Sequence, residues 1–368
     1  MVTQAETVGM DSKGLERVKL LFDEQLDQGT HPGGAMAVYR HGKLVLDLYG
    51  GIANIESNRP VTKDTLFVIF SCTKAISAFC WHLLRERGQI ELGHWIADYW
   101  PEFAKNGKEH ITSRHILTHT AGFPDTPKEL TGNKIANWFA AVNAMEDATL
   151  THQPGNVIAY HSLNFGWVLG EIVRRVDGRH ISKFLRDEIT TPLGINDLFL
   201  GLPADLEPRV AKAYPMENYE APEKVEFFNT HQAHQAVIPA ANGISTARDL
   251  ARFFAMLSLG GKLDGAELIR PGVIKEISAL QEQGKDRNSG RQVKLGLGVA
   301  IDDPSMGTPR GSGRYRHSFG HSGLGSCIAW ANLESQLAVA ILTNGVRDDV
   351  SNTLRLSALC DAVWDACL

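Results

Sequence analysis

The apolar and polar positions of this chain follow two different periods, and each period occupies its own stretches of the sequence. Apolar residues recur every three to four positions over 13–28, which predicts an amphipathic helix capped by Asp11 or Ser12. Residues 34–51 then alternate between apolar and polar around a central His-Gly pair, a pattern typical of a β-hairpin. A short apolar run next gives way to a second helical pattern over 71–88. The N-terminal part therefore predicts a helix, a hairpin and another helix.

The middle of the chain has a helical and loop-rich pattern, and strand-like runs return only near the C-terminus. From about 88 to 200 the 3.6-residue period is interrupted by Pro-Gly and Pro-Leu-Gly turns. After about residue 240, the pattern predicts a capped helix within 243–261, strands at 295–301, 326–333 and 336–345, and a closing helix over 351–368.

Strand signals at both ends of the sequence, with helices between them, indicate an α+β fold. The simplest assembly is one antiparallel sheet built from N- and C-terminal segments and flanked by the terminal helices. We predict an α/β domain formed by residues 1–70 and 236–368. A mostly helical subdomain of residues 71–235 would be inserted between these two segments, with the active site in the cleft between domain and subdomain.

Composition and charge narrow the class of protein without identifying it. The chain of 368 residues has a formal net charge of −5, and its lysines and arginines are scattered, so we expect no nucleic-acid partner. No apolar run reaches the roughly 18 residues that a membrane helix needs, and no secretion signal is evident at the N-terminus. Five irregularly spaced cysteines indicate reduced thiols. We expect a soluble cytoplasmic protein that does not bind membranes.

A serine and a lysine stand three residues apart where the apolar run of 67–70 meets the second helix. On a helix, Ser71 and Lys74 would share a face and could touch. A serine becomes a useful nucleophile when a neighbour accepts its proton, and a lysine can do so once burial lowers its pKa. The ordinary structural interpretation is a helix-capping serine followed by a solvated lysine, and this four-residue pattern alone does not exclude it.

Two further segments carry residues that could act together with this pair. Tyr160 and Ser162 follow a Pro-Gly turn. Beside a lysine the pKa of a tyrosine phenol can fall, so that the phenolate serves as a base or proton relay. His321, Ser322 and Gly323 are expected on a glycine-rich turn just before a strand, where backbone N–H groups could approach a carbonyl closely. Taken singly, a packed tyrosine and a plain glycine turn explain these segments equally well.

Taken together and in this order, the three segments resemble the serine β-lactamase and penicillin-binding-protein superfamily. Its pattern is S-x-x-K, then Y-x-N or Y-x-S, then K-T-G or a variant such as H-x-G, and here it reads SCTK, YHS and HSG. The surrounding sequence is similar to the same superfamily over nearly the whole chain, and most similar to the branch of family VIII carboxylesterases. The resemblance implies a β-lactamase/transpeptidase-like fold.

The resemblance also implies a role for each motif residue. Ser71 would be the nucleophile, and Lys74 with Tyr160 would deprotonate it and later activate water. The oxyanion hole would use the backbone N–H groups of Ser71 and Leu324.

The remaining matched residues, Ser162, His321, Ser322 and Gly323, would contact the substrate. Ser162 could hydrogen-bond to the lysine or to the substrate. His321 departs from the lysine of β-lactamases and weakens the attraction for a carboxylate, so efficient β-lactam hydrolysis is less expected than ester hydrolysis. Lys294-Leu295-Gly296 also fits the K-x-G form, but it precedes the strands where the superfamily's third motif lies.

Metal and cofactor sites receive little support from the sequence. Several histidines lie three or four positions apart, but none forms H-E-x-x-H and no carboxylate is placed as a third ligand. We expect His115 and His119 to be structural, in a loop that packs under the site. Neither a dinucleotide fingerprint nor a phosphate-binding loop is present. We therefore expect no metal and no cofactor.

The favoured function is a serine carboxylesterase that cleaves small-molecule esters through an acyl-enzyme on Ser71. An alternative keeps the acyl-enzyme but changes the bond or the acceptor, as in a D-amino-acid peptidase, an amidase, a weak β-lactamase or an acyltransferase. A binding or sensor protein without catalysis is the third possibility.

Overall fold

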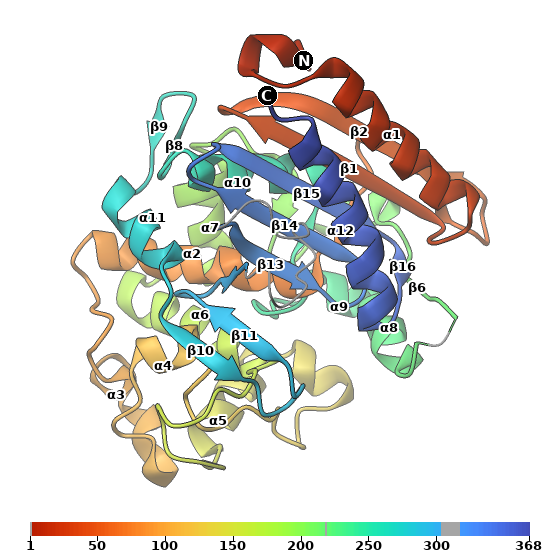
Figure 1. The fold of residues 1–368 in the computed structure, drawn as a ribbon. Coiled ribbons are helices and arrows are strands. Elements are labelled where there is room, and N and C mark those ends of the chain that lie inside the picture. The colour runs from red at the N-terminus through yellow and green to blue at the C-terminus, as the bar shows by residue number, and fades with distance from the viewer. Residues whose placement is uncertain (1, 218, 303–316) are drawn as a thin grey trace.

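One large antiparallel sheet organises the molecule, seen in a computed structural model that describes residues 2–217, 219–302 and 317–368 (Figure 1). The sheet joins nine of the described strands, drawn from both ends of the chain. In spatial order they are β10 (Glu282–Lys285), β11 (Gln292–Leu295), β12 (Ala300–Ile301), β13 (Phe319–Gly323), β14 (Cys327–Asn332), β15 (Leu337–Thr343), β1 (Gly33–Arg40), β2 (Lys43–Asn54) and β3 (Arg59–Pro60).

Helices cover both faces of this sheet and make up most of the middle of the chain. They are α1 (Ser12–Asp27), α2 (Thr73–Glu86), α3 (Ile96–Tyr99), α4 (Ser113–Leu117), α5 (Trp138–Asp147), α6 (Asn164–Asp177), α7 (Ile181–Leu185), α8 (Pro222–Phe228), α9 (His231–Gln235), α10 (Ala247–Ser258), α11 (Pro271–Ser278) and α12 (Asp349–Asp365). The other described strands are short and form three small sheets. One sheet joins β4 (Phe67–Val68), β7 (Ile244–Ser245) and β5 (Leu198–Phe199). The others are the parallel pair β6 (Tyr214–Pro215) and β16 (Gly345–Val346), and the pair β8 (Lys262–Leu263) and β9 (Ala266–Glu267).

The two faces of the central strands carry side chains of different size. In β15, Leu337, Val339 and Ile341 point to the face that α1 and α12 cover (Figure 1). The alternate residues Ala338 and Ala340 belong to the core on the opposite face, where α10 packs on β1, β14 and β15. Because successive side chains of a strand point to opposite faces, this alternation fixes which helix each face receives. Small side chains let α10 approach the sheet closely.

The first and last helices lie side by side on the sheet, and the two chain ends meet there. Figure 1 shows α1 and α12 on the same face, with the marked N- and C-termini close together. A bridge joins Met10 to Cys367, and the N–H of Asp11 donates to the carbonyl of Ala366 at 2.8 Å. The side chain of Asp11 also caps α1 by accepting from the N–H groups of Lys13 and Gly14. The sheet is thus assembled from distant segments that the terminal helices hold in place.

Most of the predicted elements are confirmed, with ends that differ by a few residues. The helix expected over 13–28 is α1, and the hairpin expected in 34–51 is β1 and β2. Its turn residues His41 and Gly42 have φ of +50° and +73°, as a two-residue hairpin turn requires. The helix expected from residue 71 becomes regular only at Thr73, after a short 3₁₀ turn over Phe70–Cys72.

The strand predicted at 295–301 is wrong, because residues 296–299 form a turn between β11 and β12. The Gly296 N–H donates to the Val299 carbonyl at 2.9 Å, and Gly298 has a φ of +86°. A Cβ on Gly296 would lie 2.2 Å from the Ile277 carbonyl oxygen, and one on Gly298 would lie 2.3 Å from the Ala78 Cβ. The run is apolar because the turn itself is buried against helices, and its glycines allow the close approach.

The unequal faces of the sheet predict unequal responses to substitution in β15. Ala340→Leu would push a larger side chain against α10 and should lower the free energy of unfolding by about 1–3 kcal/mol. Ile341→Leu, on the opposite face and of equal volume, should lower it by less than about 1.5 kcal/mol. Urea unfolding followed by circular dichroism measures both. A smaller loss for Ala340→Leu than for Ile341→Leu would contradict this assignment of the faces.

Candidate active site

Ser71 lies on the 3₁₀ turn between β4 and α2, where the chain changes direction sharply. The preceding residue, Phe70, has a φ of +41°, a left-handed conformation that is uncommon for a bulky residue. The hydroxyl of Thr73 donates to the Phe70 carbonyl and accepts from the N–H of Gly243 at 2.9 Å. This turn leaves the Ser71 side chain half-buried at the start of the helix. A backbone in such a conformation persists when surrounding contacts hold it, and such residues cluster at functional sites.

Lys74, one turn further on, is fully buried and lies next to Ser71. Its Nζ is 3.2 Å from the Ser71 Oγ, 2.7 Å from the Ser162 carbonyl oxygen and 3.0 Å from the Ala240 carbonyl oxygen. Close packing of α6 closes the space around the lysine, since a Cβ on Gly166 would lie 2.3 Å from the Pro239 carbonyl carbon. Burial disfavours the ammonium ion and lowers the pKa of Lys74 to about 7.

Tyr160 reaches the same serine from the loop that precedes α6. Its phenol donates to the Ser71 Oγ at 2.9 Å, and the Lys74 Nζ lies 4.7 Å from the centre of its ring. Burial raises the pKa of the Tyr160 phenol above its usual value. The sequence suggested that this pKa could fall beside a lysine, and the structure indicates the opposite direction. The phenol therefore stays protonated and acts as a hydrogen-bond donor.

The distances around Lys74 show which group donates and which accepts each hydrogen bond among Ser71, Lys74 and Tyr160. A neutral amine has two N–H donors and one lone pair. The two donors match the carbonyls of Ser162 and Ala240, and the lone pair is then left for the hydroxyl proton of Ser71. The Ser71 oxygen in turn accepts from Tyr160. With Lys74 neutral, the arrangement holds a serine hydroxyl against a proton acceptor.

The third motif lies on strand β13, so its placement on a turn was wrong. The turn begins only after Gly323, because His321 and Ser322 are paired with β14. A Cβ on Gly323 would lie 2.8 Å from the Ile69 carbonyl oxygen and 2.3 Å from the Cys327 Sγ. Glycine at this position lets the end of β13 press against the turn that carries the nucleophile.

His321 and Leu324 lie on either side of this close approach. The His321 ring is half-buried, with its centre 6.2 Å from the centre of the Tyr160 ring, and its Nδ1 is 2.7 Å from the Ser322 carbonyl oxygen. The His321 carbonyl accepts from the Cys72 thiol at 3.0 Å. Leu324 directly follows Gly323, so its N–H belongs to the segment beside the Ser71 turn. The structure thus brings all three motifs into one region.

Ser162 contributes to the site differently from the expectation. Its side chain is exposed, and the group that meets Lys74 is its backbone carbonyl. The second carbonyl, that of Ala240, was not anticipated at all. A backbone carbonyl at an alanine has no side-chain chemistry in the sequence, so no pattern could have identified it.

His119 packs against the tyrosine, as expected for a structural residue under the site. Its ring centre lies 4.7 Å from that of Tyr160, and its Nδ1 accepts from the His161 N–H at 3.1 Å. The ring is buried, and burial holds its pKa well below the usual value, so it is neutral. The backbone of His119 has a φ of +58°, which places its carbonyl to accept from the Ala159 N–H at 2.9 Å.

The part of the chain that the structure describes holds neither a cluster of metal ligands nor a membrane-spanning helix. Within residues 2–217, 219–302 and 317–368, no three His, Cys, Asp or Glu side chains gather as metal ligands would. Over those same residues, none of the helices has the length and apolar character needed to cross a membrane.

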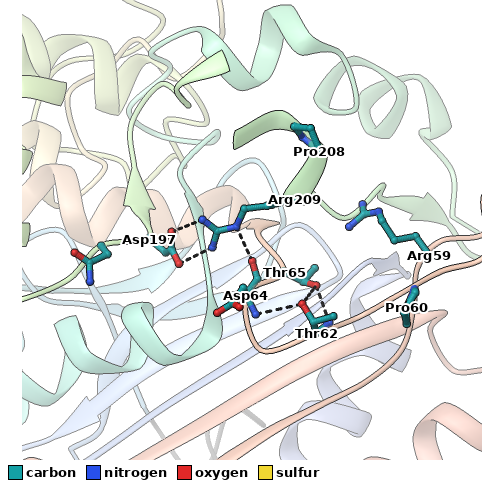
Figure 2. Close-up of a pocket in the computed structure, with 9 residues that line it drawn as sticks. Arg59, Pro60, Thr62, Asp64, Thr65, Asp197, Pro208 and Arg209 are labelled. Atoms are coloured by element: carbon teal, nitrogen blue, oxygen red, sulfur yellow. Dashed lines mark hydrogen bonds and ion pairs between the residues drawn. The ribbon is translucent and has the colours of Figure 1, made fainter. Parts of the chain in front are cut away.

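A cavity of about 640 Å³ lies away from the three motifs, lined by residues from 59–65 and 196–209 (Figure 2). Two of its charged groups pair with each other, because Arg209 makes two hydrogen bonds to the Asp197 carboxylate, at 2.9 and 2.6 Å. The same guanidinium donates to the Asp64 carbonyl at 3.0 Å. None of the motif residues lines this cavity, so we assign the chemistry to the Ser71 region.

Comparison with known proteins relates the chain to β-lactamases, esterases and penicillin-binding proteins. The model of a family described as beta-lactamase matches residues 18–359. The esterase/beta-lactamase LipL of Mycobacterium tuberculosis is 31% identical, over 85% of this chain and 77% of its own length. A penicillin-binding protein homologue from Caulobacter crescentus has 31% identity and a TM-score of 0.86, with 97% of this chain and 99% of that one covered.

A crystal structure of a family VIII carboxylesterase is similar to the same extent. It has 27% identity and a TM-score of 0.88, and the likeness covers 98% of this chain and 99% of that one. The β-lactamase/transpeptidase-like fold expected from the three motifs is therefore confirmed over nearly the whole chain. By its sequence, its fold and the order of SCTK, YHS and HSG, the chain belongs to the beta-lactamase family.

Proposed function

We propose that this protein is a serine carboxylesterase that forms an acyl-enzyme on Ser71. The observation that carries the proposal is the position of the Ser71 Oγ, 3.2 Å from the buried Lys74 amine and 2.9 Å from the Tyr160 phenol. The similarity to LipL, named an esterase/beta-lactamase, and to a family VIII carboxylesterase supports the same reaction class.

In the acylation step, the neutral amine of Lys74 accepts the Ser71 proton while the Oγ attacks the ester carbonyl carbon. The carbonyl oxygen becomes an oxyanion, which we place between the N–H groups of Ser71 and Leu324. The bond to the leaving oxygen then breaks, and the alkoxide takes the phenol proton of Tyr160. The Lys74 ammonium returns a proton to the phenolate, so the acyl-enzyme forms with every proton accounted for.

Deacylation repeats these steps with water in place of the serine hydroxyl. Water attacks the acyl carbonyl carbon as Lys74 accepts its proton, and the Ser71 oxygen leaves with a proton supplied through Tyr160. No metal or cofactor is needed to balance either step.

Esters are favoured over β-lactams because His321 occupies the position where β-lactamases have a lysine. A lysine presents a full positive charge to the carboxylate of a β-lactam, whereas a histidine at neutral pH is largely uncharged in its ordinary state. We assign Ser162, Ser322 and Gly323 as further substrate contacts in this proposal. A simple ester has no carboxylate that must be paired.

Ser71→Ala should lower kcat by on the order of 10³-fold or more while the protein stays folded. A serine-directed fluorophosphonate followed by peptide mass spectrometry should label the wild-type peptide that contains Ser71. Ser77→Ala is a matched control, because Ser77 lies on the same helix and its hydroxyl donates to the Pro239 carbonyl. Labelling in Ser71→Ala equal to that of Ser77→Ala would remove Ser71 from the mechanism.

The rate should also depend on pH through Lys74, whose pKa is about 7. Only the neutral amine accepts a proton, so kcat/KM should rise about tenfold per pH unit below pH 7 and level off above it. Initial rates on a p-nitrophenyl ester between pH 5 and 9 measure this limb.

Two variants separate Lys74 from other groups that titrate in this range. A histidine ordinarily titrates near 6.5, so His321→Asn should lower activity yet keep the midpoint of the limb. Lys108 is also buried, and its Nζ donates hydrogen bonds to the carbonyls of Lys105 and Glu146. Burial lowers the pKa of Lys108 to about 8. Lys108→Met should change stability and leave the midpoint unchanged. Loss of the limb in His321→Asn would assign it to the histidine.

A panel of acyl donors tests the choice of ester. Short-chain p-nitrophenyl esters, nitrocefin and a D-alanyl amide are compared by kcat/KM at one pH. We expect the esters to exceed the other two by at least about tenfold, since the site lacks the lysine charge of β-lactamases. Preference for nitrocefin would establish a β-lactamase, and preference for the amide would establish an amidase.

A further inference from the structure

The loop that carries Tyr160 has no hydrogen-bonded secondary structure of its own. Residues 157–163 belong to neither a helix nor a strand. The phenol nevertheless has to stay 2.9 Å from the Ser71 Oγ for the proposed proton transfers. A misplacement of about 1 Å can lower a rate by on the order of 10²-fold. Some other part of the molecule must therefore fix this backbone.

The hairpin formed by β10 and β11 supplies that support from the edge of the large sheet. Figure 1 shows it lying between β13 and the helical part of the molecule near α5. Its tip runs over 286–291, and the first tip residue, Asp286, accepts a hydrogen bond from the Tyr160 N–H at 2.8 Å. The amide of Asn288 donates to the Tyr160 carbonyl at 3.0 Å. One hairpin tip thus binds both backbone groups of the tyrosine.

A further pair of contacts anchors the same tip to the residues before Tyr160. The N–H of Arg287 donates to the Ile158 carbonyl at 2.9 Å. The Arg287 guanidinium lies 3.2 Å from the His152 Nδ1. The tip therefore follows the tyrosine loop over several residues and is not joined to it at one point alone.

The Asp286 side chain is buried and held in a fixed geometry by its hydrogen bonds. It is 3% exposed, and besides the Tyr160 N–H it accepts from the N–H and the hydroxyl of Ser289, at 2.8 and 2.6 Å. All three partners are donors, so both carboxyl oxygens of Asp286 are held by hydrogen bonds. Its charge also helps to raise the pKa of the Tyr160 phenol. The residue thus places the phenol and favours its protonated form.

We propose that Asp286, assisted by Asn288, is a positioning residue that holds Tyr160 against Ser71 for proton transfer. The proposal rests on the acyl-enzyme mechanism above, and adds to it two residues that lie outside all three sequence motifs. Among the described residues, the hydrogen bonds of these two side chains go to the Tyr160 backbone and to Ser289, and none goes to Ser71 or Lys74. Their effect on the reaction therefore passes through Tyr160.

A double-mutant cycle with Tyr160→Phe tests this dependence. Asp286→Ala should lower kcat on an ester by about 10–100-fold with KM changed less than about threefold, because the tyrosine acts in the chemical step. In the Tyr160→Phe background, where the phenol is absent, the same substitution should lower kcat by less than about twofold. Losses that multiply across the two backgrounds would overturn the proposal.

A matched control comes from another carboxylate that binds two backbone N–H groups away from the site. Asp249 accepts from the N–H groups of Asn196 and Asp197 at 2.9 and 2.7 Å. Asp249→Ala should lower the unfolding temperature and leave kcat within about twofold of wild type. An equal loss of kcat in Asp249→Ala and Asp286→Ala would mean that the loss reflects stability alone.

A second variant and a second readout cover the cases in which Asp286→Ala does not fold or the wild type does not cleave esters. If Asp286→Ala does not fold, the cycle is run with Asn288→Ala, because this exposed side chain binds the Tyr160 carbonyl. An unchanged kcat there, or a loss that persists in Tyr160→Phe, would overturn the proposal. If the wild type does not cleave esters, the proposed function fails separately. The rate of fluorophosphonate attack on Ser71 then replaces kcat in the same cycle, since it needs only an activated serine.

Discussion

Burial of the Lys74 amine is the constraint on which the rest of the site depends. A lysine in water keeps its charge at neutral pH and cannot accept a proton from a serine. Here the packing of α2 against α6 and of the segment around Ala240 removes water from the amine, and the two carbonyls satisfy its donors. The fold therefore supplies the base by excluding solvent, and Ser71 gains its reactivity from that exclusion.

The large sheet makes this burial possible by bringing distant segments to one place. Strand β13 ends against the turn that carries the nucleophile, and Gly323 permits contact there with the Ile69 carbonyl. The edge hairpin of β10 and β11 reaches from the same sheet to the loop of Tyr160. One sheet thus holds the nucleophile, the phenol and the proposed oxyanion N–H groups in position. Rigid elements of this kind are the usual basis of precise positioning.

Much of the architecture could be inferred from the sequence, because it depends on local patterns. Periodicity identified α1, the first hairpin, α10 and the terminal helix, and the strand signals at both chain ends indicated a sheet with an inserted helical part. The failures had one cause. Residues 296–299 are apolar because the turn that they form is buried. The third motif was expected on a glycine-rich turn before a strand, but it lies on strand β13 and pairs with β14. Burial by neighbouring segments overrode the local signal in both places.

The sequence by itself determined which chemical groups are available: a serine, a lysine and a tyrosine in the order of a known family. It could not determine their states. The pKa of Lys74 falls and that of Tyr160 rises because of the surfaces packed around them, and the carbonyls of Ser162 and Ala240 enter through backbone positions alone. Asp286 belongs to no motif and meets Tyr160 only after folding. Desolvation and contact depend on residues far apart along the chain, so only the tertiary structure decided them.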